Sequence, residues 1–474
     1  MEKMVVGRHK EKEKLTDALS SHRSELIAVY GRRRIGKTYL IREFYAKNMV
    51  LSVTGLSEAN KTRQIKNFAM KLNEVYGEFQ TAKYPSDWLE VFARVKQYLE
   101  SLRKTTKKKV LFIDEFPWFD SQRSGFLAAF ENFWNDYCTT RQDLVVVICG
   151  SAASYMVKNI IFNKRGLNKR ITKTIKLNPF NLQETQAFFQ YKKMPIERME
   201  LLKIYMTFGG IAEYLENIQK GESSVLAIDR MCFQDGAYLE NEFEEVFKSL
   251  FEENSYHHQI MIALSKNNKQ GIRREILLQE LQISSGGRFS DALDDLIHSG
   301  FVLKYQAYSS NRKTTLYKIY DEFCLFYLQF MKKYKGSKWT EIYQKQEYIT
   351  WCGYAFETIC LKHSFALKKA LKCDQIRSEN YAWSNANAQI DLVIDRDDNI
   401  VDLCEIKFSN DEISIDEEYL RKLRKKENEF RALTRTKKSI QTILISTWGV
   451  KENQYSSAIV TKNLTVDCLF LENE

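Results

Sequence analysis

The sequence lacks features that mark several classes of protein. It contains only four prolines, which argues against long proline-rich linkers, and none of its nine cysteines belongs to a C-x-x-C pair typical of zinc sites. No apolar run approaches the ~20 residues that span a membrane. The first fifteen residues also lack the hydrophobic core of a signal peptide. We therefore expect a cytoplasmic protein with no membrane partner, whose cysteines are plain thiols, several of them buried.

What the sequence does contain indicates a folded chain of several domains. Hydrophobic residues make up 44% of it, enough for packed cores, and 474 residues suggest roughly three or four domains. The formal net charge of +11 is compatible with a polyanionic partner such as DNA, although many proteins carry a similar excess without one.

Residues 1–180 alternate short apolar runs with longer amphipathic stretches. The runs predict buried parallel strands at Leu26–Tyr30, Val50–Val53, Val110–Ile113 and Leu144–Cys149. Helical patterns lie between them, for example at Asp87–Leu102 and Gly125–Tyr137. This alternation predicts an α/β domain with a doubly wound parallel sheet.

Three further units are expected after this domain. Residues 181–250 are helical throughout and predict a helical lid. In residues 251–335, three short helical patterns precede two alternating strands, the layout of a winged helix-turn-helix. Residues 336–474 combine a helix from Trp351 to Leu371, two strands, a basic helix and a further strand, and predict a second α/β unit.

A phosphate-binding loop follows the first predicted strand. Residues 31–38, GRRRIGKT, fit G-x-x-x-x-G-K-[ST], with a helical pattern after them. The glycines allow backbone angles that let N–H groups surround phosphate oxygens. Lys37 would meet the β- and γ-phosphates, and the Thr38 hydroxyl would bind Mg²⁺. The loop predicts ATP as cofactor.

Acidic and polar residues end the two later strands. Asp114 is expected to hold Mg²⁺, and Glu115 to orient or deprotonate the attacking water, so hydrolysis depends on Glu115. Ser151 follows the next strand and is a candidate sensor of the γ-phosphate, although an ordinary strand-end serine fits the sequence equally well.

These residues resemble the AAA+ superfamily, and most of all its prokaryotic "archaeal ATPase" branch, which is related to the STAND ATPases. The resemblance includes Val6-Gly7-Arg8, near the adenine in that branch, the segments I-D-E-F and G-S-A-A, and the segment D-E-F at Asp321. Gly209–Leu215 resembles G-G-[IV]-P-x-Y-L with Ala212 in place of proline. The nucleotide contacts then expected are Arg8, Gly31, Arg34, Gly36, Lys37, Thr38, Tyr39 and Ser151.

The same resemblance suggests further roles. Arg170 becomes a candidate arginine finger or sensor in a possible homo-oligomer, although Lys169 replaces the usual glycine and a solvated arginine is an equal alternative. Members of this branch commonly end in a domain similar to PD-(D/E)XK nucleases, also called restriction-endonuclease-like. Glu357 resembles the first acidic residue of such nucleases.

The last unit contains an acidic hairpin that fits this expectation. If the turn is centred on Asp398, Asp391 faces Glu405 across the pair of strands, ~5 Å apart. Facing carboxylates repel one another unless a cation such as Mg²⁺ or Mn²⁺ joins them. Lys407, on the same face as Glu405, could position a water for attack on a phosphate. The other interpretation is a surface hairpin with scattered charges.

Two basic segments could contact DNA phosphates. One is the helix that carries Arg421, Lys422, Arg424, Lys425 and Lys426; the other is the winged helix, with Arg288, Arg312 and Lys313. A solvated basic face and a rigid packing module are the respective alternatives.

Three functions compete on this basis. The first is an ATPase that controls a metal-dependent nuclease in DNA processing or defence. The second is a STAND-like regulatory switch whose C-terminal domain binds DNA or protein without cleaving. A protein-remodelling motor is the third, and the sequence has no clear aromatic pore loop to support it.

Overall fold

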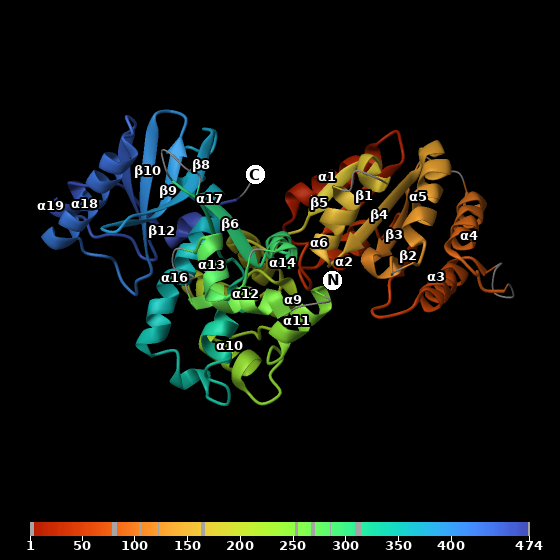
Figure 1. Ribbon diagram of the computed structural model, residues 1–474, viewed down its shortest axis with the longest axis horizontal. Coiled ribbons are helices and arrows are strands. Elements are labelled where there is room, and N and C mark those ends of the chain that lie inside the picture. Colours follow the sequence, from red (N-terminus) through yellow and green to blue (C-terminus); the bar gives the residue numbers. More distant parts are fainter. Residues whose placement is uncertain are drawn as a thin grey trace. The chain divides into compact units, whose positions relative to one another are not determined.

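The structure is a computed structural model of the whole chain (Figure 1). It describes residues 4–77, 83–103, 107–121, 123–162, 166–251, 255–266, 271–284, 286–308 and 314–472. Its internal contacts divide the chain into two compact units, Met1–Pro179 and Phe180–Glu474. The finer division into lid, winged helix and nuclease-like domain stays a prediction.

The first unit is built on a parallel sheet of five strands in the order β2-β3-β4-β1-β5. Four of its strands are the apolar runs predicted from the sequence. The fifth, β5, is short and polar and lies at an edge, and the sequence did not predict it. The bounds are β1 Glu25–Tyr30, β2 Met49–Thr54, β3 Lys109–Asp114, β4 Leu144–Gly150 and β5 Lys173–Lys176.

Helices cover this sheet (Figure 1). Helices α3, α4 and α5 share one apolar core with the alternate strand residues Leu26, Leu111 and Val146. Because every residue of β3 and β4 is buried, the central strands are enclosed on both faces, as parallel sheets require. The bounds are α1 His9–Ser20, α2 Lys37–Phe44, α3 Lys61–Val75, α4 Trp88–Ser101, α5 Phe126–Asp136, α6 Ala153–Tyr155, η4 Met156–Ile161 and η5 Gly166–Arg170.

The second unit begins with the helices expected after residue 180. A short π-helix, η6, extends α10, and Gly209 and Gly210 separate α8 from α9. The bounds are α7 Leu182–Tyr191, α8 Arg198–Phe208, α9 Ala212–Glu216, α10 Ser224–Ile228, η6 Asp229–Phe233 and α11 Glu242–Leu250.

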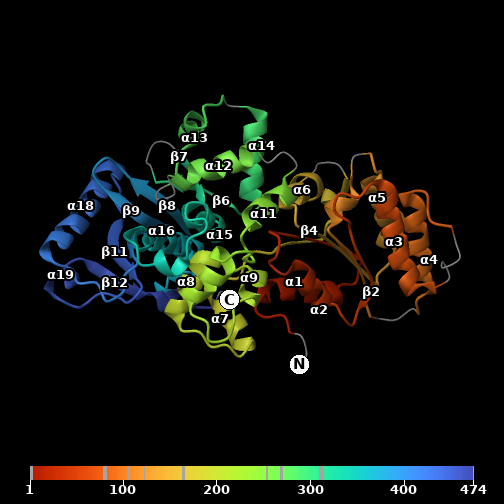
Figure 2. The ribbon, with the colours of Figure 1, turned by 90° about the horizontal axis from the view of Figure 1, so that it is seen from below.

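Three helices and a hairpin follow in the predicted order. Helices α12, α13 and α14 group beside the antiparallel strands β6 and β7 (Figure 2). The hairpin loop, with Arg312 and Lys313, lies outside the described residues. The bounds are α12 Ser255–Lys266, α13 Arg274–Glu280, α14 Gly287–His298, β6 Val302–Ala307, β7 Thr314–Ile319, α15 Glu322–Phe326 and η7 Tyr327–Met331.

The C-terminal strands and this hairpin form one mixed sheet of seven strands, in the order β12-β11-β10-β9-β8-β6-β7. Strand β6 pairs in parallel with β8, so the sheet continues across the boundary expected near residue 335. The predicted helix Trp351–Leu371 is two helices that meet at His363. The bounds are α16 Gln346–Lys362, α17 Ser364–Ala370, β8 Ser378–Ser384, β9 Gln389–Arg396, β10 Ile400–Lys407, α18 Glu417–Thr434, β11 Ser439–Ser446, α19 Gln454–Ser457 and β12 Val460–Thr465.

Two expectations about the whole chain can be compared with the structure. All nine cysteines are buried free thiols, as the absence of C-x-x-C pairs suggested. Among the helices that the structure describes, none has the length and apolar character needed to cross a membrane.

Candidate functional site

The loop of residues 31–38 adopts the conformation that its glycines allow. Gly31 and Gly36 have φ angles of 152° and 87°, in the region that side chains disfavour. A Cβ atom on Gly31 would lie 2.2 Å from the carbonyl oxygen of Leu177, so no larger residue fits there. Arg34 also has a positive φ, of 65°. The curved path of the loop between β1 and α2 therefore requires glycine at positions 31 and 36.

Lys37, the first residue of α2, is buried beneath this loop. Its ammonium donates to the carbonyl oxygens of Gly31, at 3.0 Å, and Arg32, at 2.7 Å. Burial lowers its pKa, although the nearby acids Asp114 and Glu115 oppose the shift. A phosphate arriving at the loop would be a better partner for this ammonium than neutral carbonyls, because charge-assisted hydrogen bonds are stronger.

The two residues expected to bind Mg²⁺ are adjacent. The Thr38 hydroxyl donates to Oδ2 of Asp114 at 2.8 Å, joining the start of α2 to the end of β3. Burial raises the pKa of Asp114, and the hydrogen bond from Thr38 works against that rise. A hydroxyl and a carboxylate oxygen in contact are hard donors of the kind Mg²⁺ takes, so these residues fit an ATP-bound Mg²⁺.

Glu115 and Ser151 form a second pair at the same edge of the sheet. The Ser151 hydroxyl donates to Oε1 of Glu115 at 2.6 Å, and the Ser151 N–H donates to Oε2 at 3.2 Å. Glu115 has a φ of 47°, a left-handed conformation that is uncommon outside glycine. Ser151 thus fixes the carboxylate of Glu115 directly.

The other expected nucleotide contacts are placed differently. Arg8 is buried, and its guanidinium donates to the backbone oxygens of Asn178, at 2.7 Å, and Ile35, at 3.4 Å, so it supports the loop from behind. Tyr39 lies on α2 with 43% of its surface exposed. Arg170 is exposed at the end of η5 and has no contact with the loop among the described residues.

Two other motifs of the resemblance meet in the second unit. A Cβ atom on Gly209 would lie 2.7 Å from Oε2 of Glu322, and the rings of Tyr214 and Phe323 are 5.4 Å apart. A Cβ atom on Gly210 would lie 1.8 Å from the carbonyl oxygen of Phe180. These contacts give both motifs a packing role.

The acidic hairpin has the register predicted from its sequence. Strands β9 and β10 pair Asp395 with Val401 and Leu392 with Cys404, which centres the turn on Asp398. One step further in this register brings Asp391 opposite Glu405. There Oδ2 of Asp391 accepts a hydrogen bond of 2.8 Å from the backbone N–H of Ile406.

Lysines neutralise the acids at this end of the hairpin. Lys407 pairs with Oε1 of Glu405 at 2.8 Å, and Lys426 from α18 pairs with Oε2. Burial alone would raise the pKa of Glu405, but the two lysines hold it below its usual value. Burial and the neighbouring Glu405 together raise the pKa of Asp391 to about 6.

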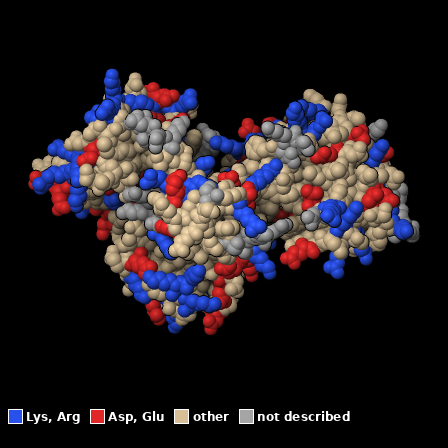
Figure 3. All heavy atoms as spheres, viewed as in Figure 1, with Lys and Arg blue, Asp and Glu red and all other residues tan. Residues whose placement is uncertain are grey.

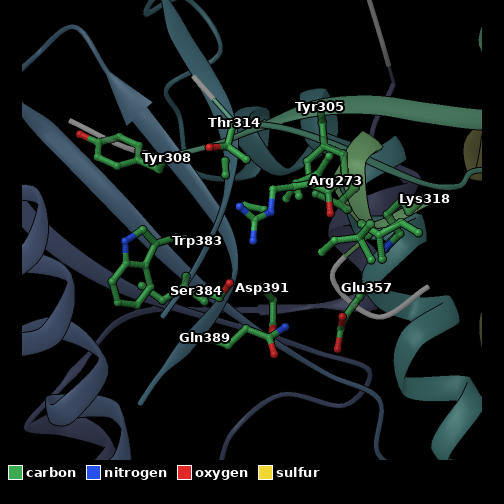
Figure 4. Close-up of a pocket in the computed structure, with 18 residues that line it drawn as sticks. Arg273, Tyr305, Tyr308, Thr314, Lys318, Glu357, Trp383, Ser384, Gln389 and Asp391 are labelled. Carbon is green, nitrogen blue, oxygen red and sulfur yellow. The ribbon is translucent and has the colours of Figure 1, made fainter. Parts of the chain in front are cut away.

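Glu357 and Asp391 line one cavity of about 440 Å³ (Figure 4). Lys318 of β7, only 2% exposed, lines it as well, and its charge interacts with both acids. Glu405 and Lys407 are not among the lining residues.

The hairpin was expected to bind Mg²⁺ or Mn²⁺ through Asp391, Glu405 and Glu357. In the part of the chain that the structure describes, no three His, Cys, Asp or Glu side chains are grouped so that they could hold a metal ion. Both Glu405 oxygens are paired with lysines, and one Asp391 oxygen accepts a backbone hydrogen bond. The donor atoms suit a hard cation, but this arrangement does not fit one.

The basic helix α18 is not a purely basic face. Its exposed Arg421 and Lys422 pair with Glu417, at 3.5 Å, and Glu418, at 2.7 Å, one turn earlier. Figure 3 shows Lys and Arg mixed with Asp and Glu over the C-terminal unit. Arg288, at the start of α14, is exposed.

Sequence reasoning missed three basic residues near the acids. Lys318 and Arg273 belong to elements assigned to another domain, and Lys426 was seen only as one of a basic run. Of these three residues, Lys318 alone could have been noticed in the sequence, because it is a charged residue in a strand predicted from its alternating pattern.

Much of the chain is similar to known proteins. Residues 5–218 match the family described as an ATPase domain predominantly from Archaea. The chain is 25% identical, over 82% of its own length and 84% of the relative's, to an uncharacterised protein of Methanocaldococcus jannaschii. A Walker-type ATPase of Pyrococcus abyssi shares the fold over 68% of this chain and 96% of its own, with 18% identity and a TM-score of 0.50. Residues 5–218 therefore contain an ATPase domain of the P-loop type.

Proposed function

We propose that this ATPase domain hydrolyses ATP through five residues at one edge of the five-stranded sheet. Lys37 contacts the β- and γ-phosphates, Thr38 and Asp114 hold Mg²⁺, and Glu115 orients the attacking water while Ser151 fixes its carboxylate. The observation that carries the proposal is the 2.8 Å contact between Thr38 and Asp114, beside the Glu115–Ser151 pair. When bound, Mg²⁺ would neutralise charge that develops on the phosphates.

Two substitutions separate binding from hydrolysis. Lys37→Ala removes the buried charge partner of the phosphates, so nucleotide binding should be lost in a titration with a fluorescent ATP analogue. Glu115→Gln keeps the shape of the site and should retain binding while turnover falls by roughly 10²–10⁴-fold, the range attributed to positioned acid–base groups. Unchanged turnover in Glu115→Gln would assign the water to another residue.

We also propose that the ATPase is coupled to a C-terminal unit that acts on DNA. The support is the hairpin, on which Asp391 faces Glu405 with Lys407 beside it, next to a cavity that contains Glu357. This is the set of residues that the resemblance to PD-(D/E)XK nucleases implies. Arg170, exposed at the end of η5, would complete the ATP site of a neighbouring copy if the protein assembles.

A second candidate follows from the lysines. Because Lys318, Lys407 and Lys426 neutralise the three acids, the hairpin is charge-balanced without a metal ion. That balance favours a regulatory ATPase switch, whose C-terminal unit binds DNA without cutting it.

One experiment distinguishes these candidates. Supercoiled and linear DNA are incubated with the full chain and Mg²⁺ or Mn²⁺, with and without ATP, and Glu405→Ala is the matched variant. Cleavage by the wild type and none by Glu405→Ala supports the nuclease. If neither protein cuts DNA, but DNA affinity differs between ADP and a non-hydrolysable ATP analogue, the switch is supported. DNA affinity that is absent in every state contradicts both.

A further inference from the structure

The cavity beside Asp391 has walls from two segments far apart in the sequence. One wall comes from residues 271–276, strands β6 and β7 and Tyr308, and the other from β8, β9 and α16. The parallel pairing of Gln306 with Tyr381 and of Ala307 with Ala382 joins the two walls into one sheet. The cavity is therefore a built feature of the second unit.

Arg273 reaches into this cavity from the residue before α13. Figure 4 shows its side chain extending between Trp383 and Lys318. The residue is exposed, and its guanidinium makes no ion pair or hydrogen bond with any residue that the structure describes. An arginine of this kind is suited to bind a phosphate with two parallel hydrogen bonds.

The other charged residues of the cavity leave an acidic excess. Lys318 is buried against Glu357 and Asp391, so the floor carries two acids and one internal cation. A ligand with several negative charges, such as free ATP, would be repelled by these acids. A phosphodiester carries one charge, which Arg273 alone can match.

Aromatic residues form the side opposite Lys318 and Glu357. Tyr308 and Trp383 both line the cavity, and both rings contact Phe430, at centroid distances of 5.1 and 5.4 Å. Their positions are thus fixed before a ligand arrives. Trp383 is only 5% exposed, so the half-buried Tyr308 is the ring that a ligand can reach. Aromatic side chains held in this way are the platforms on which unstacked bases bind in single-stranded nucleic acids.

We propose that this cavity binds one unstacked nucleotide of a DNA strand, with Arg273 on a phosphate and the base against Tyr308. A volume of about 440 Å³ lies within the usual range for sites that enclose small ligands. The proposal rests on the DNA-acting function proposed for the C-terminal unit. It gives Arg273 and Tyr308 the task of holding a strand next to Asp391.

The test measures binding of the full chain to a labelled single-stranded oligonucleotide by fluorescence anisotropy, with EDTA present so that nothing is cut. Arg273→Ala should weaken binding by roughly tenfold, and the slope of log affinity against log salt concentration should fall by about one. Arg273→Lys should retain part of the affinity that Arg273→Ala loses. Lys304→Ala is the matched control, because Lys304 lies on β6, is exposed and does not line the cavity. Its affinity should stay within about twofold of the wild type.

Photo-crosslinking locates the base. An oligonucleotide that contains 5-iodouracil should crosslink to the peptide with Tyr308, and a free nucleoside monophosphate should not compete at the same concentration. If Arg273→Ala and Lys304→Ala bind the oligonucleotide with equal affinity and the crosslinks lie elsewhere, the proposal for this cavity is wrong, while the DNA-acting function stands. If the free nucleotide competes, the cavity is a site for a small molecule and the proposal that it binds a DNA strand is wrong. No DNA binding by the wild type would overturn both proposals.

Discussion

Replacing Lys426 with methionine should convert the hairpin into a metal site. In the structure both oxygens of Glu405 are paired with lysines, and the Glu405 side chain is only 5% exposed. A divalent ion must displace Lys426 before it can bind there. Lys426→Met removes that competitor and leaves Asp391 and Glu405 with a deficit of positive charge.

The size of the effect follows from the ion pair that is lost. Breaking a buried pair costs about 3–5 kcal/mol, and because Lys407 remains beside Glu405 we expect about 2 kcal/mol. At 1.4 kcal/mol for each factor of ten, the variant should bind Mn²⁺ about 30-fold more tightly than the wild type. Lys422→Met is the control on the same helix: Lys422 and its partner Glu418 are 64% and 72% exposed, so solvent screens their pair and its loss should leave Mn²⁺ affinity unchanged.

The assay is the loss of the free Mn²⁺ signal in electron paramagnetic resonance, without nucleotide. Adding Glu405→Ala to Lys426→Met should abolish the gain, because one of the two facing carboxylates is then missing. Equal Mn²⁺ affinity in the wild type, Lys426→Met and Lys422→Met would refute the reasoning. So would a gain that survives Glu405→Ala.

Two further predictions concern ATP turnover and stability. Ser151→Ala removes the 2.6 Å hydrogen bond that fixes Glu115, so kcat for ATP should fall by roughly tenfold, about one hydrogen bond, while nucleotide affinity stays the same; a fall in affinity instead would support direct contact with the nucleotide. His363 accepts a 3.0 Å hydrogen bond from the N–H of Leu182, and burial lowers its pKa from 6.5 to about 4. As pH falls below 6.5, the unfolded chain binds a proton at this histidine before the folded chain does. The free energy of unfolding should therefore decrease by about 3 kcal/mol between pH 6.5 and pH 4. In His363→Gln, unfolding curves measured across this pH range should show a smaller decrease.

The parts of the fold that sequence reasoning predicted depend on local patterns. The buried strands β1, β3 and β4 are continuous apolar runs, so their burial could be deduced without a partner. Strand β5 could not, because its four residues include two lysines and it lies at the sheet edge with one neighbour. Strand β8, SENYAWS, is similarly polar and was not predicted.

The candidate site shows the same limit. Asp391 and Glu405 were placed opposite one another because a tight turn fixes the register of both strands. The pairing of Lys426 with Glu405 depends on how α18 packs on the sheet, and no spacing rule specifies that packing. Lys318 comes from β7, which joins this sheet through β6, the strand that pairs in parallel with β8.

The lysines also bear on how a DNA strand would affect metal binding at this hairpin. Facing carboxylates in an apolar sheet need a compensating charge, and a nuclease of this type obtains it from a metal ion that also serves the reaction. Here side chains from β7, β10 and α18 supply the charge instead. DNA phosphates attract lysines, so a bound strand would compete with Glu405 for Lys426 and lower the energy needed to admit a metal ion. If so, Mn²⁺ affinity of the wild type should rise when an oligonucleotide is added, and that of Lys426→Met should not. If DNA does not change the Mn²⁺ affinity of the wild type, the lysines neutralise the hairpin permanently and it serves only as a binding element.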